Sequence, residues 1–295
     1  MQCVVFFSFQ SSCDGYIIFA PRLNMKNVTR LYFFFGMALL SLLFPACSEY
    51  NKVVKSTDIE YKYAKSLEYY NNKEYHKSLP ILEELIGLTR GTQRAEDVYY
   101  YYAKSQYGVK DYYLANYYLK TFTKTFSIST RCEECLFLAA ECSYNLSPTF
   151  TLDQTDTQNS IDEYQLFLDK YPNSNLRDSA NVRVSRLNNK LEQKAYENAR
   201  IYSKTLKYKA ASASLKDFIK KYPESRYKEE AMYLIVMNSY QYAIGSIDEK
   251  KLERLRLTSE NYLTFASAFP KSKWLNDAES YYKKSQKQIE GLTKK

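Results

Sequence analysis

Histidine is almost absent from this sequence: His76 is the single one among 295 residues. Because histidine is the side chain whose ordinary pKa lies closest to neutrality, the chain has few routes to general acid–base catalysis near pH 7. It also contains no glycine-rich phosphate loop and no HExxH zinc motif, and Trp274 is the only tryptophan that could stack on a sugar. We therefore expect a protein that is not an enzyme and that holds no cofactor or metal ion.

Glycine and proline are scarce as well, with seven of each. Both residues are frequent in the turns of β-sandwiches and loop-rich folds, so their scarcity argues against those classes. Tyrosine is abundant instead, with 31 residues, and Leu, Lys, Ala and Glu are common. This composition favours an all-α fold.

Neither sign of charge is gathered in one block. From Cys47 onward, basic residues outnumber acidic residues by seven, and the two signs alternate along the chain. Alternating charges are typical of solvated helix faces, whereas a nucleic-acid or lipid-headgroup patch requires clustered Lys and Arg. We therefore expect no nucleic-acid partner.

The longest apolar run, Leu31–Phe44, has the features of an export signal. Lys26 and Arg30 precede it, and Ala46 stands directly before Cys47. The run has 14 residues, whereas a membrane-spanning helix needs about 20. A cysteine after the cleavage position resembles the lipobox of bacterial lipoproteins, in which the cysteine becomes acylated. We expect lipid attachment at Cys47, with a plain secreted protein and an uncleaved anchor as the alternatives.

The N-terminal segments follow from this signal. Residues 1–24 place a second apolar patch ahead of a complete signal, so we expect translation to begin at Met25 and this extension to be misassigned. Residues 25–46 are then the lipoprotein signal peptide, and the polar residues 47–57 are a lipidated tether.

A repeated pattern begins after the tether. Lys73-Glu74-Tyr75 and Lys110-Asp111-Tyr112 occupy equivalent places 37 residues apart, each between two amphipathic segments with alternating small and large apolar residues. Pairs of antiparallel helices give this pattern, because small residues allow close approach and large ones fill the gap. The spacing resembles the tetratricopeptide repeat, and it predicts repeats 1 and 2 over residues 58–128.

Three further units follow. Repeat 3 covers 129–175 and contains an insertion loop at 147–156, and repeats 4 and 5 with a C-terminal capping helix cover 176–295. Proline ends helices, and three tetrads of the form aromatic-Pro-x-Ser mark helix ends at Tyr171, Tyr222 and Phe269. The fold class is therefore an all-α, tetratricopeptide-like helical-hairpin solenoid of about five repeats.

These features together resemble the BamD family, lipoproteins of the outer-membrane β-barrel assembly machinery. The most specific parts are the segments 147–174, which contains LDQTDT, and 207–225. The resemblance implies a non-enzymatic scaffold, lipid-anchored on the periplasmic face of the outer membrane. It also implies two partners: a barrel-inserting assembly protein, docked through the C-terminal repeats, and unfolded barrel proteins, whose C-terminal segments enter an N-terminal groove.

Repeat geometry predicts which side chains line that groove. A tyrosine offers ring area together with a hydroxyl for exposed backbone groups, and Lys104 is expected to pair with a terminal carboxylate. Core packing between helices is an equal alternative for each tyrosine. The predicted groove residues are Tyr63, Leu67, Tyr70, Asn71, Tyr100, Lys104 and Tyr107.

Two alternatives stay open at this stage. An exported tetratricopeptide adaptor for cell-wall or division proteins would share the leader and the repeats. In addition, Cys132, Cys135 and Cys142 favour buried thiols, but a disulfide between the first two, one helical turn apart, or a metal site also fits their spacing.

Overall fold

The computed structural model describes residues 45–293. The predicted extension 1–24 and nearly all of the predicted signal therefore lie outside the described residues. The predicted lipid attachment site Cys47 lies in helix α2 (Pro45–Lys55) by its backbone, but its side chain is also outside the described part. Within 45–293 there are twelve helices and no strand, so the all-α prediction is confirmed.

Two compact units divide the chain, residues 1–62 and 63–295. The described part of the first unit holds α2 and the start of α3 (Ile59–Asn71). Asp58 begins α3, because its Oδ1 accepts a hydrogen bond from the Tyr61 N–H at 3.1 Å. This is the usual way in which an N-cap residue satisfies a free donor of the first turn.

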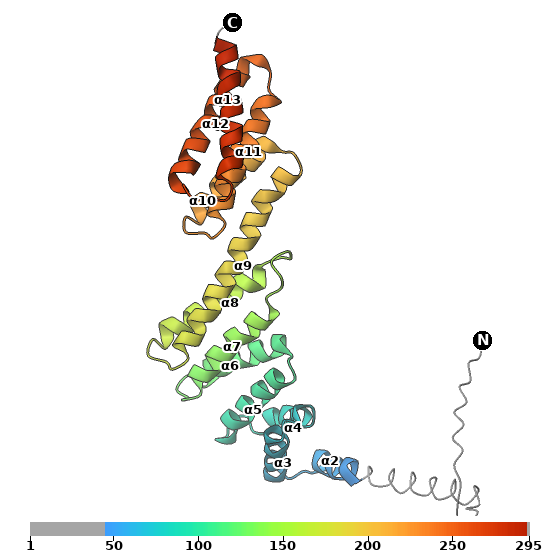
Figure 1. Cartoon of the computed structure of the whole chain (residues 1–295). Helices are drawn as coiled ribbons and strands as arrows, with labels where there is room; N and C mark the ends of the chain where they lie inside the picture. The colour runs from blue at the N-terminus through green and yellow to red at the C-terminus, as the bar shows by residue number, and fades with distance from the viewer. Residues whose placement is uncertain (1–44, 294–295) are drawn as a thin grey trace, which may run out of the picture. The chain divides into compact units, whose positions relative to one another are not determined.

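The second unit consists of successive antiparallel helices (Figure 1). Each helix packs mainly against its neighbours in sequence, which is the organisation of a solenoid. The five hairpins pair α3 with α4 (Tyr75–Leu88), α5 (Arg94–Gly108) with α6 (Tyr112–Thr125), α7 (Cys132–Leu146) with α8 (Thr155–Lys170), α9 (Arg177–Lys204) with α10 (Tyr208–Lys221), and α11 (Lys228–Ile244) with α12 (Asp248–Ala268).

The turns within three hairpins adopt the same backbone conformation. Lys73, Lys110 and Leu206 have φ values of 61°, 65° and 59°. In each case the residue itself and the next one donate N–H bonds back to the last turn of the preceding helix. This is the left-handed helix ending that glycine normally provides. The 37-residue spacing found in the sequence therefore corresponds to a repeated turn conformation.

The junctions between hairpins also repeat. At Ser129, Ser174 and Ser225 the hydroxyl accepts the N–H of the residue two positions later, at 3.0–3.1 Å. Each hydroxyl also donates to a glutamate on the first helix of the preceding hairpin, at 2.5–2.6 Å. Ser129 ends the segment Phe126–Ser129, a fourth tetrad in which serine stands in place of proline. The predicted helix punctuation thus also ties neighbouring hairpins together.

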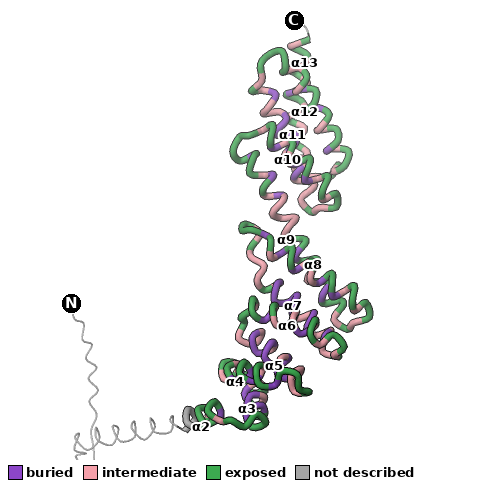
Figure 2. Tube along the Cα trace, turned by 180° about the vertical axis from the view of Figure 1, so that it is seen from behind, coloured by how far each residue is buried: buried purple, intermediate pink, exposed green. Residues whose placement is uncertain are grey.

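Helix α9 is shared by two hydrophobic cores. Its 28 residues contain no glycine or proline, so nothing interrupts it. Ala180 and Leu187, in its N-terminal half, are buried with α7 and α8, whereas Tyr196 and Ala199, in its C-terminal half, are buried with α10 and α11. Figure 2 shows buried segments in both halves. One helix therefore ends the third repeat and begins the fourth.

The insertion loop is held firmly to α9. Thr155 already lies in α8, so the loop covers 147–154. Gln154 is buried and its amide donates to three backbone carbonyls of the loop. From α9, Lys190 Nζ donates to Ser147 Oγ at 2.6 Å and Lys194 Nζ donates to the Leu152 carbonyl.

The last helix, α13 (Leu275–Thr293), covers the fifth hairpin. It packs against α12 and α11, and it buries Ala278 and Ser285 on one side. Before it, Trp274 stacks on Tyr233 of α11 with ring centres 5.8 Å apart. These contacts confirm the predicted C-terminal capping helix. None of the helices in residues 45–293 combines the length and the apolar character that crossing a membrane requires.

Candidate functional site

The predicted groove residues are gathered on the first helices of the first two hairpins, α3 and α5. Tyr70 of α3 meets Tyr101 of α5 edge-to-face, with ring centres 5.0 Å apart, and Tyr101 meets Tyr100 at 5.2 Å. We call this the tyrosine surface and define it by Tyr63, Leu67, Tyr70, Asn71, Tyr100, Tyr101, Lys104 and Tyr107.

The members of the tyrosine surface differ in their access to solvent. Tyr63 and Tyr100 are each only 8% exposed, so most of their ring area packs inside the protein. Leu67, Tyr70 and Tyr107 are half-buried, and Asn71 is exposed. Tyr63 is further covered by the guanidinium of Arg94, 4.4 Å from its ring centre. The accessible part of the surface is therefore centred on Tyr70 and on Tyr107.

Lys104 is bound within the protein. Its Nζ donates to Glu134 Oε1 on α7 at 2.6 Å and to the Tyr100 hydroxyl at 3.0 Å. The same Tyr100 hydroxyl donates to Glu134 Oε2 at 2.6 Å. Burial, helped by the Glu134 carboxylate, raises the pKa of Tyr100 to about 12. The three groups form a closed network that joins the second hairpin to the third.

Arg131 makes a second connection between these hairpins. Its Nη1 binds Asp97 Oδ1 at 2.6 Å, and its guanidinium lies 4.6 Å from the centre of the Tyr100 ring. Burial opposes the charge of Arg131, but the hydrogen bond to Asp97 and the negative charges of Asp97 and Glu96 together raise the pKa of the guanidinium. The tyrosine surface therefore lies beside cations whose charge is already balanced by acids of the same protein.

Farther along α7, a buried carboxylate organises the next part of this face. Glu141 is 7% exposed. It accepts hydrogen bonds from the Tyr164 hydroxyl at 2.5 Å and from Arg183 Nε and Nη2 at 2.8 and 3.2 Å. Arg183 also lies over the ring of Tyr144, 4.4 Å from its centre. Tyr107 packs against the core cluster that contains Ala139 and Cys142 of α7, so the Glu141 cluster borders the tyrosine surface. Burial raises the pKa of Tyr107.

Beside the Glu141 cluster, a hollow of about 600 Å³ opens between α7 and α9. We call it the α7–α9 hollow. Phe137, Leu176 and Val182 give it apolar walls, and Val182 is 50% exposed. Its polar lining consists of Glu141, Asp178, Ser179, Arg183 and Arg186.

Sequence reasoning missed Glu134, Glu141 and Tyr101. Glu134 and Glu141 are seven residues apart on α7, which places them on one helix face, and this spacing is visible in the sequence. What the sequence does not contain is the partner of each acid, because Lys104 and Arg183 lie 30 and 42 residues away on other helices.

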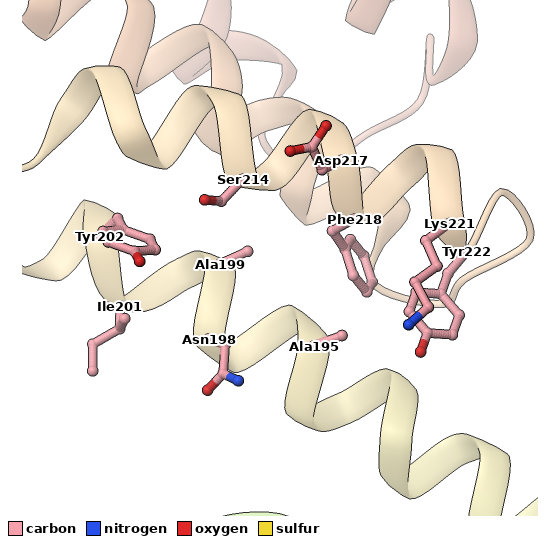
Figure 3. Close-up of a pocket in the computed structure, with 10 residues that line it drawn as sticks. All are labelled: Ala195, Asn198, Ala199, Ile201, Tyr202, Ser214, Asp217, Phe218, Lys221 and Tyr222. Atoms are coloured by element: carbon pink, nitrogen blue, oxygen red, sulfur yellow. The ribbon is translucent and has the colours of Figure 1, made fainter.

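A different surface lies between the C-terminal half of α9 and α10, around a hollow of about 450 Å³. In Figure 3, Ala195 and Ala199 point from α9 toward α10, whereas Asn198 and Ile201 point away from it. Ile201 is 54% exposed and Tyr202 is 42% exposed. We call this the α9–α10 surface. Tyrosine is enriched at protein–protein interfaces, so the exposed Tyr202 makes this surface a candidate contact.

The three described cysteines are buried free thiols. Cys132 donates to the Phe126 carbonyl, with Sγ and O 3.1 Å apart. Burial raises the pKa of Cys135 to about 12 and also raises that of Cys142. Thiols with a high pKa and no access to solvent react slowly. In residues 45–293 no group of His, Cys, Asp and Glu side chains is arranged to hold a metal ion.

Comparison with known sequences identifies the family. The sequence model of the YfiO family, described as outer membrane lipoprotein, matches residues 56–213 and 202–289, which is most of the chain. The chain belongs to the YfiO family of outer membrane lipoproteins. The match covers all five hairpins, including the insertion loop and nearly all of the capping helix.

Two curated relatives are each named outer membrane protein assembly factor BamD. The one from Neisseria meningitidis serogroup B (strain ATCC BAA-335 / MC58) is 26% identical over 256 residues, covering 80% of this chain and 91% of the relative. The one from Neisseria gonorrhoeae is 24% identical over 241 residues, covering 77% and 85%. The resemblance to the BamD family is thereby confirmed, and both relatives are named as assembly factors.

Among solved structures, the tetratricopeptide-repeat domain of P58(IPK) is similar over 80% of this chain and 67% of that chain. The TM-score is 0.37 and the sequence identity is 12%.

Proposed function

We propose that this protein is a non-enzymatic scaffold of the β-barrel assembly machinery, anchored by lipid on Cys47 to the periplasmic face of the outer membrane. The observation that carries the proposal is the family match along residues 56–289, together with two curated relatives that are named assembly factors. The export signal and the cysteine that follows it support the anchor.

In this role the tyrosine surface receives the C-terminal segments of unfolded barrel proteins. Tyr70 and Tyr107 offer half-exposed rings and hydroxyls, which suit an extended peptide with apolar side chains and unpaired backbone groups. Tyr63 and Tyr100 contribute mainly by holding the helices in place, because they are almost fully buried.

The C-terminal repeats dock the barrel-inserting protein, and the α9–α10 surface is the candidate contact. Ile201 and Tyr202 are exposed apolar side chains beside a hollow, and such side chains supply much of the binding energy at protein interfaces.

The test is a pull-down in mild detergent from native membranes, with a tag after Lys295 and mass spectrometry of the co-purified chains. A large outer-membrane barrel protein with periplasmic domains should be recovered in near-stoichiometric amount. The double variant Ile201→Glu, Tyr202→Glu should reduce that recovery at least fivefold. Leu114→Glu on α6, which changes a side chain of similar exposure (43%), is the matched control and should leave it unchanged.

Other results would count against the proposal. Recovery of cell-wall synthesis or division proteins without a barrel protein would favour an exported adaptor instead. Equal loss of the barrel protein in the α6 control and in the double variant would mean that the α9–α10 surface is not the contact.

A further inference from the structure

Lys104, the cation predicted to bind a client's carboxylate, is already hydrogen-bonded to other side chains of the protein. Lys104 Nζ lies 2.6 Å from Glu134 Oε1 and 3.0 Å from the Tyr100 hydroxyl. A carboxylate that approached Lys104 would have to displace Glu134 or share the ammonium with it. The two acids would then lie close together, and like charges at short range repel. Another cation on the same face is therefore better placed for this task.

The α7–α9 hollow contains such a cation. Arg186 lines it and is exposed, and no acidic side chain in residues 45–293 forms an ion pair with it within 4.0 Å. The neighbouring Arg183 differs, because two of its nitrogens bind Glu141. Arg186 is thus the cation in the hollow whose fork of donors remains available for a carboxylate.

The lining of the hollow combines charged and apolar side chains that suit a chain end. Asp178, Val182 and Arg186 are spaced at four-residue intervals and lie on one face of α9. Asp178 and Arg186 are about 12 Å apart along the helix at 1.5 Å per residue. Between them, Val182 faces the apolar walls made by Phe137 and Leu176. When the terminal carboxylate of a peptide binds Arg186, the apolar side chain of its last residue lies against Val182. The backbone N–H groups of the peptide then point toward Asp178.

The hollow continues the tyrosine surface. Glu141 and Arg183 line the hollow, and both act electrostatically on Tyr107 at the edge of the tyrosine surface. Tyr107 also packs against the core cluster that contains Cys142, the residue next to Glu141 on α7. A peptide that lies along Tyr107 therefore comes close to the side chains of α7 that line the hollow.

We infer that the α7–α9 hollow binds the terminal residue of the client chain, with Arg186 as the partner of the free carboxylate and Phe137, Leu176 and Val182 around its apolar side chain. The inference rests on the proposed function, in which barrel-protein C-terminal segments are received on this face. It assigns the terminal carboxylate to the third and fourth repeats instead of to Lys104 in the second.

The experiment measures peptide affinity by fluorescence anisotropy with the full-length protein in mild detergent. Three labelled ten-residue peptides are compared: one that alternates apolar and polar residues and ends in Phe with a free carboxylate, the same peptide as its C-terminal amide, and a scrambled acid. The wild-type protein should bind the acid about 5- to 10-fold more tightly than the amide. Arg186→Gln should bind both with equal affinity.

Two further variants locate the effect. Lys209→Gln also removes one positive charge, on the exposed side of α10, and should keep the preference for the acid. Val182→Trp should weaken binding of acid and amide alike by filling the hollow. Because Arg186 and Val182 are exposed, Arg186→Gln and Val182→Trp should each retain the wild-type melting temperature.

Each remaining outcome is decisive. A preference for the acid that persists in Arg186→Gln, that disappears in Lys209→Gln, or that is absent from the wild type overturns the assignment to Arg186 while the proposed client binding stands. If the wild-type protein binds no peptide better than the scrambled one, the client-receiving role itself is wrong.

Discussion

Lys104 of α5 and Glu134 of α7 form an ion pair of 2.6 Å in the middle of the tyrosine surface. The Tyr100 hydroxyl bonds to both partners, so the pair is part of a network and not a lone surface contact. It joins the second hairpin to the third at the place where the sequence predicted an available lysine.

The pair makes stability depend on pH. Burial pushes the pKa of Glu134 upward, but the hydrogen bonds from Lys104 and Tyr100 and the charges of Lys104 and Arg131 together hold the pKa below its ordinary value near 4.5. A carboxyl with a lowered pKa contributes stability above its unfolded pKa, and this contribution is lost as the pH falls through the folded value.

We therefore expect Glu134→Gln to lower the free energy of unfolding at pH 7 by roughly 0.5–1 kcal/mol, a small value because Glu134 is 43% exposed and screened. The difference from the wild type should shrink on acidification below about pH 4.5. Urea unfolding at pH 7 and at pH 3.5 checks this. A difference that grows at the lower pH would contradict it.

Gly108 is a position where a side chain does not fit. A Cβ there would lie 2.5 Å from Cδ2 of Tyr75, whereas at Gly87, within α4, it would meet nothing within 4 Å. Gly108→Ala should therefore destabilise the protein by about 1–3 kcal/mol, and Gly87→Ala should stabilise it by roughly 0.5–1 kcal/mol. Thermal unfolding of the two variants, which add the same methyl group, should give shifts of opposite sign.

Leu206 is 68% exposed and holds a left-handed backbone conformation, with φ 59°. A residue other than glycine is strained there by about 1 kcal/mol or more. Leu206→Gly should stabilise the protein by roughly 0.5–1 kcal/mol, and Leu206→Ala, which keeps the strain, should not. Melting temperatures measured side by side decide this, and equal values for the two variants would contradict the strain argument.

The serines that end the aromatic-Pro-x-Ser tetrads should contribute measurably to the free energy of unfolding. Ser174 Oγ donates to Glu133 and accepts from the Leu176 N–H, so Ser174→Ala removes a hydrogen bond in the turn before α9 and a bond between hairpins. We expect a loss of roughly 1–2 kcal/mol in urea unfolding. Ser127→Ala, at an exposed position just after α6, is the control and should change stability by less than about 0.5 kcal/mol.

The buried thiols should react only after unfolding. Burial raises the pKa of Cys132, Cys135 and Cys142, so few thiolates form in the folded protein near pH 7. A thiol reagent should label the three slowly in buffer and fast in 6 M guanidinium, with all three recovered by mass spectrometry. Recovery of Cys132 and Cys135 as an unlabelled pair that becomes reactive only after reduction would show a disulfide instead.

The sequence predicted the hairpins well because their signals are local. The turns at Lys73 and Lys110, the tetrads and the capping helix all reflect backbone and packing preferences of residues that are close together in the chain. The same reasoning missed Phe126–Ser129, because it searched for proline although the shared structural element is the serine. It also missed that α9 is continuous, although residues 177–204 contain no residue that breaks a helix.

The candidate site was predicted only in part. The residue types on the first helices placed Tyr70 and Tyr107 on an accessible face, but the sequence assigned the same role to Tyr63 and Tyr100, which are almost fully buried. Whether a tyrosine lines a surface or packs in the core depends on the neighbouring hairpin, and helical periodicity alone does not contain that neighbour.

By itself, the sequence determined the helical class, the repeat spacing and the turns, because each depends on residues close together in the chain. Only the tertiary structure decided which charges are paired. Lys104 and Glu134 are 30 residues apart, and Glu141 and Arg183 are 42 apart. They meet because successive hairpins stack in one register, and this stacking leaves Arg186 available in the hollow between α7 and α9.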